Sequence, residues 1–190
     1  MNTQKKRMST EKLVLGAVLT ALVIILQFMG TFIRFGPFQI SLVLIPIVIG
    51  AARCGTFIGG WLGFVFGLVV LLNGDAAPFL AVNAAGTILT VLVKGTACGL
   101  AAGLAYRFFA KFNRVLAVAI AAIVCPIVNT GIFLIGCALF FMGLIREWAG
   151  SDTVAHYIVF GIVGGNFLVE LASNLVLSPI VVRLLGFRKE

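Results

Sequence analysis

The chain has 190 residues, of which 62% are hydrophobic and only 11% are charged. A soluble domain carries about a quarter charged residues, which it needs to cover its surface. This composition therefore excludes a soluble enzyme, a nucleic-acid-binding domain and a disordered chain, and it predicts an integral membrane protein. The net charge of +8 fits the excess of Lys and Arg that membrane proteins keep on their cytoplasmic side.

Six apolar segments are predicted to cross the membrane as helices, because crossing about 30 Å of hydrocarbon takes roughly 20 helical residues. In chain order they cover residues 13–30, 38–52, 56–72 and 85–106, then lie within 115–144 and within 157–185. We expect an all-α integral membrane protein: one compact domain of six transmembrane helices over residues 1–190. Residues 1–12 are its short basic N-terminus, and residues 186–190 are its tail.

The distribution of basic residues predicts the orientation. An even number of helices places both termini on one side of the membrane, and eleven basic residues would then share that side: Lys5, Lys6, Arg7, Lys12, Arg53, Arg107, Lys111, Arg114, Arg183, Arg188 and Lys189. The opposite loops hold Arg34 and Arg146, while Lys94 lies inside the fourth segment. Because basic residues concentrate in cytoplasmic loops, both termini are expected in the cytoplasm.

Glycines spaced by four form two stripes, which are Gly55, Gly59, Gly63 and Gly67 in the third segment and Gly95, Gly99 and Gly103 in the fourth. Residues four apart share a helix face, and small ones let two backbones approach closely. Packing within the bundle and docking of another subunit both account for these stripes.

Patterns for a metal, a cofactor or ATP hydrolysis are missing from the sequence. The four cysteines are scattered through apolar runs without the spacing of a metal site, so we interpret them as small buried hydrophobic residues. The chain also lacks a Walker A motif, and any energy for transport must come from an ion gradient or a partner.

Polar residues within the apolar segments predict a ligand pocket. Inserting a charged side chain at the centre of the membrane costs on the order of 3 kcal/mol of free energy. We therefore expect Lys94 and Glu170 each to have a partner or a function. They either pair only with each other or line a water-filled cavity. The proposed binding residues are Lys94, Asn129, Asn166, Glu170 and Asn174 within the segments, and Asn73, Asp75 and Asn83 around the loop after the third segment. Asn166, Glu170 and Asn174 share one helix face, because they are spaced by four.

Several stretches resemble the S components of energy-coupling factor (ECF) vitamin transporters. The matching stretches are residues 35–50 (FGPFQISLVLIPIVIG), the glycine-rich residues 55–67, residues 99–106 (GLAAGLAY), residues 177–179 (LSP) and the Ala17-x-x-x-Ala21 pair. The resemblance implies a six-helix subunit of the bacterial cell membrane, not an enzyme, that binds a vitamin or related micronutrient from outside. The residue 40–50 stretch is closer to pantothenate- and folate-type members than to riboflavin-type ones.

The resemblance also implies partners and moving parts. Ala17 and Ala21 would dock on a membrane scaffold subunit (T component) that carries two cytoplasmic ATPases. The loop after the first helix would act as a gate, with Arg34, Phe35 and Phe38 in it. From the residues alone, that aromatic loop is equally explained by burial in the membrane interface.

Two alternatives remain from the residues. The first is a self-sufficient, proton-coupled secondary carrier for a small polar solute, with Lys94 and Glu170 as a proton relay. The second is a membrane enzyme or assembly factor, which the lack of a His, Cys or carboxylate cluster disfavours.

Overall fold

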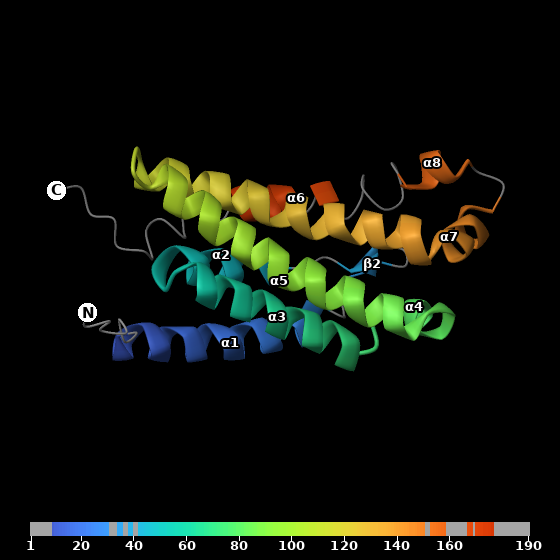
Figure 1. Ribbon diagram of the computed structural model, residues 1–190, viewed down its shortest axis with the longest axis horizontal. Helices are drawn as coiled ribbons and strands as arrows, with labels where there is room; N and C mark the ends of the chain where they lie inside the picture. Colours follow the sequence, from blue (N-terminus) through green and yellow to red (C-terminus); the bar gives the residue numbers. More distant parts are fainter. Residues whose placement is uncertain are drawn as a thin grey trace, which may run out of the picture.

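A computed structural model describes residues 9–30, 34–35, 38–39, 42–150, 153–158, 167–168 and 170–176. Within these residues the element order is α1 (Thr10–Gly30), β1 (Arg34–Phe35), β2 (Phe38–Gln39), α2 (Leu44–Arg53), α3 (Thr56–Leu72), α4 (Ala77–Val82), α5 (Ala84–Phe109), α6 (Arg114–Phe140), α7 (Met142–Ala149) and α8 (Val154–His156) (Figure 1). Residues 170–176, called the last helical segment below, are also helical. The predicted helical architecture is confirmed, with one antiparallel two-residue hairpin added.

Among the described residues, three helices (α1, α5 and α6) are long and apolar enough to cross a membrane, and α2 and α3 are shorter apolar helices. The third predicted segment coincides with α3, and the first and fourth lie inside α1 and α5. Most of the fifth segment is α6, which ends at Phe140 and is followed at once by α7. Much of the sixth predicted segment lies outside the described residues.

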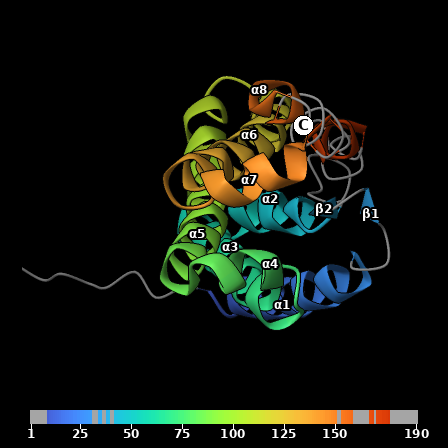
Figure 2. The same cartoon turned by 90° about the vertical axis from the view of Figure 1, so that its right-hand side faces the viewer.

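The predicted start of the second segment, residues 38–52, was wrong. Phe38 and Gln39 form strand β2, and the helix starts only at Leu44. Its ten residues rise about 15 Å, or half the hydrocarbon thickness. Pro46 in the first turn is compatible with this start, because the first helical N–H groups have no intrahelical acceptor. Leu44 and Ile47 are fully buried, and α2 contacts α1, α3, α5 and α6. Helix α2 is therefore a central core helix (Figure 2).

The glycine stripes pack α3 directly on α5. A Cβ atom at Gly59 would lie 2.7 Å from the carbonyl oxygen of Gly99, and one at Gly63 would collide with the carbonyl oxygen of Gly95. These distances are too short for any side chain, so the two backbones are in contact. Packing within the bundle is thus confirmed for both stripes. Gly55 is the exception, because it precedes α3 with φ of 107° and a Cβ there would touch nothing within 4 Å in the described part of the chain.

The two ends of the bundle differ in character. Helices α4, α7 and α8 gather at one end, which we call the capped end (Figure 1). The opposite end holds the start of α1, the end of α2 and the α5–α6 connection (Figure 1). The described basic residues there are Lys12, Arg53, Arg107, Lys111 and Arg114. This separation of charge is the pattern that the predicted orientation requires.

Candidate ligand-binding site

Lys94 lies in the middle of α5, among aromatic rings and opposite charges. Its Nζ atom is 5.0 Å from the centroid of the Phe133 ring of α6 and 5.7 Å from that of Phe66 of α3. Ring faces attract a cation at such distances. The carboxylates of Glu170 and Asp75 attract it electrostatically, and the thiols of Cys98 and Cys137 lie near it. The residue as a whole is of intermediate exposure, but its ammonium is desolvated by burial among these groups.

Glu170 and Asn174 lie on one buried face of the last helical segment. Glu170 is 2% exposed and Asn174 is 3% exposed. The Asn174 side-chain amide donates a hydrogen bond to the Glu170 backbone carbonyl, 3.0 Å away. Two of the three residues of the predicted polar stripe therefore face the protein interior, and Asn166 lies outside the described residues. Because Glu170 interacts with Lys94, this face is turned toward α5.

Asn129 adds an unused hydrogen-bond acceptor in α6. The residue is 5% exposed, and its Oδ1 atom has no hydrogen-bond partner among the described residues. Leaving such an acceptor unsatisfied costs about 1–3 kcal/mol. Asn129, Phe133 and Cys137 are spaced by four and so share a helix face. Since Phe133 and Cys137 both interact with Lys94, Asn129 lies on the face of α6 that is turned toward this lysine.

Asn73 and Asp75 form a tight turn between α3 and α4. The Asn73 side-chain amide donates to Asp75 Oδ2, and the Asp75 backbone N–H donates to Asn73 Oδ1 over 3.1 Å. Asp75 Oδ2 also accepts a hydrogen bond of 3.0 Å from Gln27 Nε2 of α1. Sequence reasoning missed Gln27. The available signal was a single amide in an otherwise apolar segment, and the structure buries it to 1% exposure.

Asn83 has a local role at the start of α5. Its Oδ1 atom accepts a hydrogen bond of 2.9 Å from the Gly86 backbone N–H, which makes it the N-cap of the helix. This amide oxygen is thereby occupied, and the predicted role of Asn83 in ligand binding gains no support from its geometry.

An aromatic cluster closes the capped end of the bundle beside Lys94. Phe79 of α4 packs edge-on against Phe133, Phe141 and Trp148, with ring centroids 5.0–5.5 Å apart. Edge-to-face pairs of this kind stabilise by about 0.5–1.5 kcal/mol beyond the burial of their area. Phe133 belongs to the cluster and also lies against the Lys94 ammonium. Phe79 and Trp148 therefore form an apolar wall against the ring that lies beside the Lys94 ammonium.

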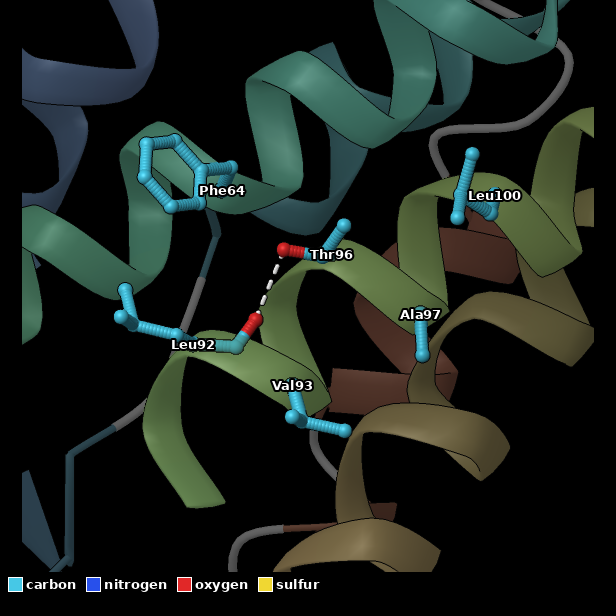
Figure 3. A pocket seen from close by; sticks show the side chains of 6 residues that line it. All are labelled: Phe64, Leu92, Val93, Thr96, Ala97 and Leu100. Carbon is cyan, nitrogen blue, oxygen red and sulfur yellow. Dashed lines mark hydrogen bonds between the residues drawn. The ribbon is translucent and has the colours of Figure 1, made fainter. Parts of the chain in front are cut away.

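A groove between α3 and α5 has a different chemistry. It has a volume of about 370 Å³ and is lined by Phe64, Leu92, Val93, Thr96, Ala97 and Leu100 (Figure 3). The Thr96 hydroxyl donates to the Leu92 carbonyl, 2.7 Å away within the same helix (Figure 3). This groove therefore offers an apolar surface at the depth of the membrane and no free polar group for a polar ligand.

The predicted gate and docking residues lie at separate places. Arg34 pairs with Gln39, and Phe35 with Phe38, so all three gate residues are in the hairpin between α1 and α2. Ala17 and Ala21 are exposed on α1. The buried face of that helix consists instead of Gly16, Leu19, Val23 and Gln27. Two small residues, one turn apart, are thus available on the outer surface of α1.

Comparison with known protein families identifies a match over most of the chain. The family model for the ECF transporter, substrate-specific component, matches residues 11–183. No curated protein matches the chain.

Proposed function

Because the chain belongs to the substrate-specific components of ECF transporters, we propose that it captures a vitamin or related micronutrient from outside and delivers it inward. The family is one of transporter subunits rather than enzymes. Family membership, together with three helices able to cross a membrane, makes this a multi-pass protein of the cell membrane. The orientation with both termini in the cytoplasm, which follows from the basic residues, is part of the proposal.

The observation that carries the binding site is Lys94 at mid-helix depth. Its ammonium has aromatic rings on two sides and the Glu170 carboxylate as an electrostatic partner. The carbonyl oxygen of Asn129 is available as an acceptor on the face of α6 turned toward it. A ligand with one carboxylate and nearby hydroxyl or amide donors would satisfy both groups. This favours a pantothenate- or folate-like vitamin over a riboflavin-like one.

The energy source in this proposal is a partner complex. Ala17 and Ala21 leave a shallow strip on the outer surface of α1, where another membrane helix can approach closely. We propose that this strip docks on the ECF scaffold subunit with its two cytoplasmic ATPases. The hairpin with Arg34, Phe35 and Phe38 would gate the site from the outside.

The ligand is identified first. Native mass spectrometry of the protein, purified without added vitamins, is expected to reveal a copurifying small molecule. Titration of the emptied protein with pantothenate, folate and riboflavin then ranks the three. Tight binding of none of them, with no copurifying molecule, would contradict the proposed function.

A transport experiment separates the proposal from a proton-coupled carrier. Proteoliposomes with the chain alone are expected to bind the identified vitamin without accumulating it. Accumulation should require the scaffold, both ATPases and ATP. Uptake by the chain alone that follows a pH gradient would instead establish the secondary carrier, with Lys94 and Glu170 as its proton relay.

A further inference from the structure

Gln27 is a buried amide on the inner face of α1 with a partner on another element. Its side chain is 1% exposed, and its Nε2 atom donates to Asp75 Oδ2 over 3.0 Å. Burying an amide is unfavourable unless it forms hydrogen bonds. The contact joins positions that are 48 residues apart in sequence. The bond therefore acts as a specific tie between α1 and the α3–α4 connection.

The acceptor of this bond is held firmly on its own side. Asn73 donates to the same Asp75 oxygen, and the Asp75 backbone N–H donates back to Asn73. Gly74 between them has φ of 86°, a conformation that favours glycine. The Ala77 N–H also bonds the Gly74 carbonyl over 3.0 Å. The connection is thus a preorganised turn, and Gln27 fixes its position against α1.

Two routes lead from this turn to Lys94. Asp75 interacts with Lys94 electrostatically. The turn also leads directly into α4, whose Phe79 packs on Phe133, the ring beside the Lys94 ammonium. A displacement of the turn would therefore move the Asp75 carboxylate relative to Lys94 and would also shift the Phe79 ring that packs on Phe133.

We propose that Gln27 is a positioning residue that ties α1 to the α3–α4 turn and transmits movement of α1 to the Lys94 site. Ala17 and Ala21 lie on the outer face of the same helix, and Gln27 follows Ala21 by about 9 Å along the axis. A partner docked on the outer face would act through the rigid helix on the turn. This last step rests on the proposed function, whereas the tie itself does not.

Spin labels test the tie without any ligand. One label is placed at Ile25 of α1 and one at Ala77 of α4, because both positions are exposed. The four native cysteines are buried, and labelling of the parent protein measures their background. Electron paramagnetic resonance then gives the distance distribution between the labels. The parent protein is expected to show one narrow distribution.

Three variants separate the hydrogen bond from packing. Gln27→Met keeps the length of the side chain and removes its donor, and a second population at longer distance is expected. Thr20→Val is the matched control, because the Thr20 hydroxyl bonds the Gly16 carbonyl within α1; it should leave the distribution narrow. Gln27→Glu places two carboxylates together at neutral pH. It should resemble Gln27→Met at pH 7.5 and the parent at pH 5, where a shared proton restores a donor.

The outcomes are decisive in both directions. An unchanged distribution in Gln27→Met overturns the tie. A change in Gln27→Met without acid recovery in Gln27→Glu also overturns it, because the effect would then come from packing. If Gln27→Met fails to fold, the pH series of Gln27→Glu still decides. Since no ligand is used, failure of the tie leaves vitamin capture untouched, and failure of vitamin capture leaves the tie standing.

Discussion

The two sides of α5 pack against their neighbours in different ways. Toward α3, Gly95 and Gly99 bring two backbones into contact, and no side chain fits between them. Toward α6, Lys94 lies over the Phe133 ring, and the residue keeps an intermediate exposure although its ammonium is buried. The side that faces α3 packs backbone against backbone, and we call it the closed side. The side that faces α6 holds the partly exposed residue Lys94, and we call it the open side. Lys94 and Gly95 are adjacent in sequence, so a rigid glycine interface holds the lysine in place.

The largest effect is expected from adding a side chain to the closed side. Gly63→Leu would drive its side chain into the Gly95 carbonyl, and overpacking by several atoms against backbone leaves the neighbours no way to yield. We expect little folded protein to be recovered from detergent. Gly131→Leu is the matched control, because a Cβ atom there meets no atom of the described residues within 4 Å. Normal recovery of Gly63→Leu on size-exclusion chromatography would show that α3 and α5 are not in backbone contact.

The next effect concerns transport alone. Ala17→Trp places a large ring on the exposed strip of α1, where it blocks close helix approach. ATP-driven uptake with scaffold and ATPases should be abolished, and vitamin binding by the isolated chain should be unchanged. Ala17→Ser, which stays small, should retain uptake. Loss of binding together with uptake would point to a misfolded bundle.

On the open side of α5, Lys94→Met is expected to weaken vitamin binding more than tenfold, or by about 1.4 kcal/mol. The variant removes the charge while it keeps an unbranched chain among the rings of Phe66 and Phe133. It also removes the positive charge with which the Glu170 carboxylate interacts. Lys94→Met/Glu170→Gln restores charge balance and should fold as well as the parent protein. Calorimetric titration measures both variants, and normal binding by both would establish the pair as purely structural.

The sequence predicted the closed side better than the open one. Residues four apart share a helix face, and this spacing was enough to predict two surfaces of small residues, although it did not predict that these surfaces pack on each other. The extent of α2 was misjudged because an apolar run looks alike in a core helix, a hairpin and a membrane span. Gln27 was missed since its partner Asp75 is 48 positions away, and no local pattern reports such contacts. Asn83 was placed in the site on polarity alone, although an Asn before an apolar helix also predicts an N-cap.

The smallest effect is expected at Asn129, on the open side. It tests whether this residue lowers the stability of the protein while it contributes to ligand binding. The Oδ1 atom of Asn129 is buried without a hydrogen-bond partner among the described residues, so Asn129→Leu, with the same branching, removes an unsatisfied group. The variant should gain up to about 1 kcal/mol in the free energy of unfolding and bind the vitamin a few-fold more weakly. Thr130→Val, in the same turn, is the control and should change binding little. Melting temperature and affinity are measured on the same preparations. A variant that loses stability would mean that Asn129 is satisfied in the empty protein, and then α6 would hold no acceptor reserved for a ligand.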